Sequence, residues 1–239
     1  MRDVLSETYA VGSLTVVVAG APQYEEGKLL GFYFACRRHI SEMIIGDVWE
    51  AVFSKVTSPD NPMFKNVKEK WDKLDKDCPR VLDLVEQDLK QTKTSTIAVV
   101  SNFLEEASPR ADYREVAELC LILLGEEPPR GIHWAKPGAI HQARWMARNI
   151  YCMKMLMFSK ELKYNTDTIF KLERMNKFLA LFYTSHWVTT TSAADAPIHD
   201  LQLMKDMLQY KQHDYELATS VLKKMNNHPW YLTHLVQHT

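Results

Sequence analysis

Apolar residues recur at intervals of three and four positions through most of this 239-residue chain, a spacing typical of helices with one buried face. Proline-rich runs, such as residues 58–62, separate one periodic stretch from the next. Only 8 glycines and 10 prolines are present, which argues against long irregular stretches. The pattern predicts helices over residues 31–56, 64–74, 80–91, 95–107, 112–125, 139–161, 167–186, 199–210 and 214–226.

Residues 112–125 form the best-defined of these helices. Asp112 and Glu115 stand in the order of a capping box, with aspartate in place of serine or threonine. Leu119 and Leu123 continue its buried face, and Gly125 is a typical residue to end it. The helix over 139–161 has apolar residues on several sides, so we expect protein to surround it.

A single strand candidate stands at residues 14–18, where β-branched residues lie between glycines. It is either the edge of a larger α/β unit or the start of a helix. The predicted fold class is therefore mainly α, a bundle-like array of helices with at most one or two strands. The loop at 126–131 divides the chain into regions 1–125 and 126–239, unless the two form one continuous domain.

The composition, with 46% hydrophobic and 25% charged residues, is that of a soluble globular protein. No run approaches the roughly 18–20 apolar residues that span a bilayer. Acidic residues follow the first methionine, where a signal peptide needs an apolar stretch. The four cysteines are far apart, which indicates free thiols in a reducing compartment. We expect an intracellular protein with no membrane contact.

Basic residues are concentrated in one stretch of the chain. Residues 130–177 hold ten lysines and arginines against three acids, a charge of +7, while the whole chain carries −1. Such asymmetry indicates a surface that faces a polyanion, although a solvated helix face is the commoner cause. We name residues 130–177 the basic segment.

The basic segment contains the candidate nucleic-acid-binding residues. His141, Arg144 and Arg148 share one side of the helix predicted over 139–161, and Lys154 follows on the same helix. Arginines so placed can grip a phosphate. The alternative is structural: Arg144 pairs with a buried carboxylate while Trp145 packs in the core.

Cys36 and His39 have the spacing of two metal ligands, since a gap of two residues lets both side chains reach one ion. A closed zinc site needs four ligands, and no second pair stands at a suitable distance, so we predict no metal here. A Cys–His nucleophilic dyad would need a third group to orient it. Phosphate-binding loops, nucleophile elbows and dinucleotide fingerprints do not occur in the sequence, so we predict neither an enzyme nor a cofactor.

Two short segments resemble hAT-like DNA transposases. Residues 35–42, with Cys36 and His39, are similar to the Cys-x-x-His segment that follows the second catalytic aspartate in that family. Arg144 and Trp145 resemble its Arg-Trp signature. Residues 112–125, 129–131, 137–141 and 228–232 also look similar to transposon-derived proteins. The resemblance implies a ribonuclease-H-like core with a helical insertion, in which three acidic residues bind two divalent metals.

The sequence departs from that family at the catalytic aspartate. Residues 16–22 contain no acid where the resemblance places it, so we predict no metal-dependent DNA cleavage. The function expected is that of a transposon-derived nuclear protein lacking the catalytic acids, with weak, non-specific DNA binding through phosphates. The alternative is a helical protein-interaction module that binds a protein partner or a second copy. One positive surface over the basic segment would favour the first; scattered or salt-bridged cations would favour the second.

Overall fold

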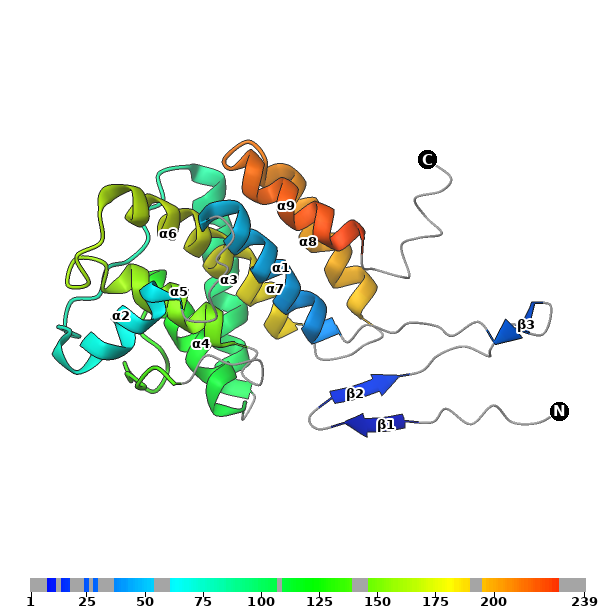
Figure 1. Ribbon diagram of the computed structural model, residues 1–239, viewed down its shortest axis with the longest axis horizontal. Helices are drawn as coiled ribbons and strands as arrows, with labels where there is room; N and C mark the ends of the chain where they lie inside the picture. The colour runs from blue at the N-terminus through cyan, green and yellow to red at the C-terminus, as the bar shows by residue number, and fades with distance from the viewer. Residues whose placement is uncertain are drawn as a thin grey trace.

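The computed structural model describes residues 8–11, 14–17, 24–25, 28–29, 37–53, 61–106, 109–138, 146–189 and 195–227 (Figure 1). Helices dominate these residues, which confirms the predicted mainly α class. The helices are α1 (Arg37–Phe53), α2 (Pro62–Lys70), η1 (Trp71–Lys73), α3 (Gln87–Glu106), α4 (Ala111–Leu123), α5 (Ala147–Met157), α6 (Thr166–Phe178), η2 (Leu179–Tyr183), α7 (Thr184–Thr189), α8 (Ala196–Tyr210) and α9 (Tyr215–Asn226).

The strands form two short antiparallel pairs. β1 (Thr8–Val11) pairs with β2 (Leu14–Val17), and β3 (Tyr24–Glu25) pairs with β4 (Lys28–Leu29). β2 coincides with the predicted strand candidate. The described residues thus hold four strands where the sequence indicated at most one or two, because two-residue strands are too short to show alternation.

The helices share one hydrophobic core. Among the described residues it runs as a single cluster from Ile44 in α1 to Met225 in α9, and therefore includes residues from both sides of the loop at 126–131. Helix α1 packs along α9, and α8 and α9 form a helical hairpin beside it (Figure 1). The ends of the helical part of the chain are thus brought together.

Helix α2 and the short η1 follow the predicted apolar stripe. The side chain of Asn61 caps α2 by accepting a hydrogen bond from the Met63 amide at 2.9 Å. Phe64, Val67 and Trp71 then face the core, as their spacing indicates.

The prediction of a separate helix over residues 80–91 is wrong. Residues 80–85 have no regular secondary structure, and a single helix, α3, covers the later part of this prediction and most of the one over 95–107. The Arg80 amide donates to the Met157 carbonyl at 2.9 Å, and the Leu82 amide donates to the Leu123 carbonyl at 2.8 Å. Both acceptors are last-turn carbonyls of helices, which lack partners within their own helix. The amides of residues 80 and 82 satisfy them, and the chain enters its helix only afterwards, at Gln87.

The capping box predicted for α4 is also wrong, while its end is confirmed. Asp112 accepts two hydrogen bonds from the Arg110 side chain at 2.6 Å, and Arg110 occupies the N-cap position without a side-chain cap bond. At the other end Gly125 has φ of 81°. Its amide donates to Ile122, and the Glu126 amide donates to Leu121, which is a Schellman motif.

Helix α5 is shorter than the helix predicted over 139–161. It ends at Met157, and the chain then turns, with Lys163 in the left-handed region at φ of 59°. Residues 139–145 lie outside the described residues. All of α5 except Arg148 is buried, which confirms that protein surrounds this helix.

Helices α6, η2 and α7 run continuously, and the middle part, η2, is a π-helix. Its carbonyls accept hydrogen bonds from three side chains: Leu179 from Thr184 at 2.8 Å, Ala180 from Cys120 at 3.4 Å, and Leu181 from Thr96 at 2.8 Å. Because two of these donors belong to α3 and α4, tertiary contacts hold the π-helical register.

Candidate functional site

The residues of the predicted family motifs lie largely outside the described residues. Cys36 is one of these, and so are His141, Arg144 and Trp145. His39 falls in α1, but its side chain is outside the description. In the part of the chain that the structure describes, no group of three or more His, Cys, Asp or Glu side chains could hold a metal ion.

Arg148 is half-buried in the first turn of α5, against α1. Its Nη1 atom lies 3.1 Å from the position that a Cβ atom would take on Gly46. The glycine, which has no side chain, leaves the room that this guanidinium occupies. Arg148 therefore lies at the junction of two helices.

The prediction that Lys154 contacts nucleic acid is wrong. Its side chain is 0% exposed, and its ammonium donates to Glu115 at 2.5 Å and to the Ala135 carbonyl at 2.6 Å. The same ammonium stands 4.5 Å from the centre of the Trp71 ring. Burial lowers the pKa of Lys154, and Glu115 opposes that shift. A lysine enclosed in this way cannot reach a phosphate.

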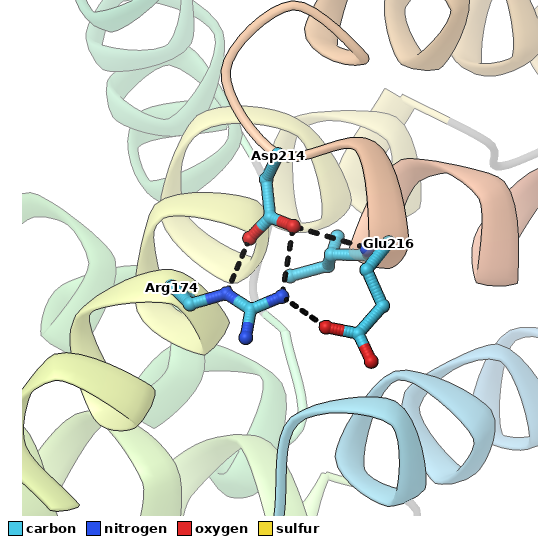
Figure 2. A network of polar contacts seen from close by, with 4 residues as sticks. Arg174, Asp214 and Glu216 are labelled. Carbon is cyan, nitrogen blue, oxygen red and sulfur yellow. Dashed lines mark hydrogen bonds and ion pairs between the residues drawn. The ribbon is translucent and has the colours of Figure 1, made fainter. Parts of the chain in front are cut away.

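Arg174 serves a second structural ion-pair network, which joins α6 to the start of α9 (Figure 2). Its guanidinium donates to both oxygens of Asp214, at 2.7 and 2.9 Å, and to Glu216 at 2.9 Å. Asp214 also caps α9 by accepting from the Leu217 amide at 3.1 Å. These carboxylates raise the pKa of Arg174.

Other cations of the basic segment are paired as well. Of the nine that the structure describes, five form ion pairs with acidic residues: Arg130 with Glu118, Lys136 with Asp72, Lys154 with Glu115, Lys171 with Asp167, and Arg174 with Asp214 and Glu216. These pairs lie on different elements of the fold. Five of the nine described cations are thus paired with acids at separate places in the fold, which is the salt-bridged arrangement expected of the interaction module.

An exposed apolar line runs along α8. Ile198, Leu201 and Leu208 are 70%, 45% and 57% exposed. We name these three residues the α8 stripe. Their spacing places them on one face of the helix, while Leu203 and Met207 occupy the buried face. Sequence reasoning missed the stripe, because apolar residues on two faces of a helix do not reveal which face is covered.

The aromatic ring of Tyr215, at the start of α9, adds to the exposed apolar surface of the hairpin. This residue is 69% exposed, and the ammonium of Lys211 lies 5.5 Å from its ring centre. Lys205, between Leu201 and Leu208, is also exposed. The hairpin thus exposes four large apolar side chains, with Lys205 and Lys211 close to them.

A groove of about 500 Å³ lies beside this surface, between α3, the η2–α7 region and α8. We name it the α3–α8 groove. His213 and Asp88 approach to 2.6 Å at its wall, and His186, also in the wall, lies 3.1 Å from Asp200. The uncharged polar residues of the lining include Gln91, Thr92, Ser95, Ser185, Gln202 and Gln209.

Asp206 of α8 lies in the wall of the groove and is half-buried. The Gln202 side-chain amide donates to it at 2.8 Å. Burial raises the pKa of Asp206, and Gln202 and His186 oppose that shift. Nearby, the rings of Phe182 and Tyr210 pack with their centres 5.0 Å apart. The groove therefore combines carboxylate, amide and aromatic groups.

Comparison with family models, with curated proteins and with solved structures gives no relative to report. The resemblance to hAT-like transposases stays a prediction. Within the described residues, every helix is too short or too polar to cross a bilayer.

Proposed function

We propose that this chain is a helical protein-interaction module that binds a partner protein through the α8 stripe. The observation that carries the proposal is the outward face of α8, where three large aliphatic side chains stand in line on a helix whose opposite face is buried. Single exposed apolar residues are ordinary, but aligned ones are typical of interaction sites.

The physical driving force is removal of apolar surface from water. Each Å² of such surface contributes about 25 cal/mol when it is buried. Helical anchors spaced three, four or seven residues apart are a recurrent mode of peptide and helix recognition. Ile198, Leu201 and Leu208 have this kind of spacing on a helix already held by the core. The partner would gain a preformed surface, without the entropy cost of folding α8.

Placement of the basic segment supports binding to protein over binding to nucleic acid. Affinity for DNA needs several cations that reach phosphates together. In the described structure, Lys154 and Arg174 are held by carboxylates inside the fold. The proposed role is therefore binding of a protein, without DNA contacts or catalysis.

Site-specific photocrosslinking tests the proposal. A photoreactive amino acid at Leu201 is expected to capture a protein partner in cells, whereas the same group at Val85, which is exposed and outside any helix, is not. The captured protein is then purified and its affinity measured. Ile198→Ser with Leu208→Ser should weaken binding at least about tenfold, which is 1.4 kcal/mol.

The matched control replaces two exposed apolar residues elsewhere, Val81→Ser with Val85→Ser. This control should bind as the unchanged protein does. Equal binding by the stripe variant and the unchanged protein would remove the stripe from the interaction and overturn the proposal.

A DNA titration tests the competing function. Duplex DNA binding, followed by fluorescence anisotropy, is expected to give a slope of log affinity against log salt shallower than about −2, because each phosphate contact contributes about −0.9. A steeper slope that Lys160→Ala with Lys163→Ala flattens would restore the nucleic-acid function, since both lysines are exposed in the basic segment.

A further inference from the structure

We propose that the α3–α8 groove is a recognition pocket for a basic side chain, an arginine guanidinium or a lysine ammonium. The claim that this basic side chain belongs to the protein bound on the α8 stripe rests on the proposed function. The claim that the pocket prefers an organic cation follows from the groove alone and does not rest on the proposed function.

The groove is large enough to admit a long side chain. The groove encloses about 500 Å³, within the range of roughly 300–1,000 Å³ that small-ligand pockets occupy. Its walls come from α3, η2, α7 and α8, which the core holds in place. It is thus a hollow between packed helices with fixed walls.

Charge in the groove selects for a cation. Asp88 and Asp206 line it, and the described lining includes neither a lysine nor an arginine. Asp88 is already close to His213. Asp206 differs, because in the described part of the chain it accepts a hydrogen bond from Gln202 and feels His186 electrostatically, but forms no ion pair within 4 Å. A carboxylate that is partly removed from water gains most from a cation brought to it.

Aromatic and amide groups add acceptors of the right kind. Tyr210 and His213 stand with ring centres 5.7 Å apart in the groove wall. Tyr210 is buried, so a guanidinium would stack on the half-buried His213 ring while it donates to carboxylate and amide oxygens. The side-chain oxygens of Gln202 and Gln209 supply the uncharged acceptors at the rim.

The groove opens next to the α8 stripe. Gln202 and Gln209 line it, and they are the immediate neighbours of Leu201 and Leu208 in the chain. One step along a helix turns the side chain by about 100°. A partner lying on the stripe would therefore pass the groove rim, and one long basic side chain could enter.

Nuclear magnetic resonance titration of the whole chain with blocked amino acids tests the pocket. The probes are N-acetyl-arginine methylamide, N-acetyl-lysine methylamide and N-acetyl-citrulline methylamide, the last being a neutral analogue of arginine. Arginine or lysine is expected to shift the amide signals of Gln202, Asp206 and Gln209. Citrulline is expected to bind at least about tenfold more weakly, as a charge-assisted contact is lost.

Two groove variants and one control make the test specific. Asp206→Asn and Asp88→Asn should each reduce affinity for the cationic probe severalfold. Asp195→Asn should not, because Asp195 is exposed on the same helix outside the groove and makes no cap bond. Asp88 is at the surface, so its variant keeps the fold even where Asp206→Asn does not.

The outcomes separate the two proposals. Equal shifts from citrulline and arginine, or none from any probe, would overturn the cation pocket. Ile198→Ser with Leu208→Ser should leave binding of the blocked arginine unchanged, because the stripe is not in the groove. If the probe binds but the stripe variant also retains the protein partner, the pocket stands and the proposed function fails.

Discussion

In the basic segment and in the α8–α9 hairpin, the charge pattern of the sequence and the surface exposed by the fold disagree in opposite ways. The basic segment has the strongest charge signal in the chain, yet Lys154 and Arg174 are tied to carboxylates in the fold. The hairpin has no charge signal, yet it presents the α8 stripe to solvent. Two of the cations that made the basic segment look functional are structural, and a helix without a charge signal carries the candidate surface.

The difference arises because sequence does not show long-range partners. Glu115 lies 39 residues from Lys154, and Asp214 lies 40 residues from Arg174. Counting charges within a window misses such pairs. An apolar residue likewise has the same identity whether it faces the core or water. Three sets of substitutions and one labelling experiment test this contrast.

Loss of the buried ammonium should have the largest effect. Lys154→Ala is expected to lower the free energy of unfolding by about 3–5 kcal/mol, because it empties a fully buried position and leaves Glu115 without its cation. Denaturant titration measures the change. Lys154→Met combined with Glu115→Gln should recover most of the loss, since neither charge then remains.

If Lys154→Ala lowered the free energy of unfolding by less than about 1 kcal/mol, the contrast between the basic segment and the hairpin would not hold. It would mean that the lysine is accessible, as a phosphate-binding residue must be.

Removal of the cation that joins α6 to α9 should have a smaller effect. Arg174→Ala is expected to cost about 2–4 kcal/mol, because the Asp214 carboxylate, 9% exposed, keeps its cap bond to α9 but loses its cation. Thermal and denaturant unfolding measure it.

The matched control is Lys171→Ala, which removes a neighbouring cation of the same helix that pairs with an exposed aspartate. It should cost no more than about 0.5 kcal/mol. Similar costs for Arg174 and Lys171 would show that the network in Figure 2 contributes little to stability.

Substitutions in the α8 stripe should leave stability nearly unchanged. Ile198→Ser and Leu208→Ser are each expected to change the free energy of unfolding by no more than about 0.5 kcal/mol, because both side chains are already in water. Leu203→Ala, on the opposite face of the same helix, should cost about 2–5 kcal/mol through the cavity it leaves. A large loss of stability from the stripe variants would assign those residues to the core.

The prediction with the smallest expected effect concerns the reactivity of the cysteine thiols. Burial raises the pKa of Cys120 and of Cys152 to about 12, which suppresses the thiolate that reacts with alkylating agents. Iodoacetamide at pH 8 should therefore modify the exposed Cys78 in the native protein and the two buried cysteines only in denaturant. Mass spectrometry of peptides measures this. Fast native labelling of Cys152 would show that α5 is less enclosed than its neighbours indicate.

Local patterns determined where most helices lie. The 3.6-residue period placed α2, α4 and α9, and Gly125 marked the end of α4, because a turn to positive φ is a local requirement that glycine meets. The predicted start of α9 was equally local, since the Asp214 side chain bonds to an amide three residues ahead.

Tertiary structure decided the features that depend on distant groups. Residues 80–85 lie outside any helix, and the amides of Arg80 and Leu82 there donate to helix-end carbonyls of α5 and α4. The π-helical register of η2 relies on Thr96 and Cys120 from other helices. The outward face of α8 and the walls of the α3–α8 groove exist only once α3, α7 and α9 have packed. The sequence by itself determined the local hydrogen bonds and helix periods, whereas packing determined which side chains are paired and which are exposed.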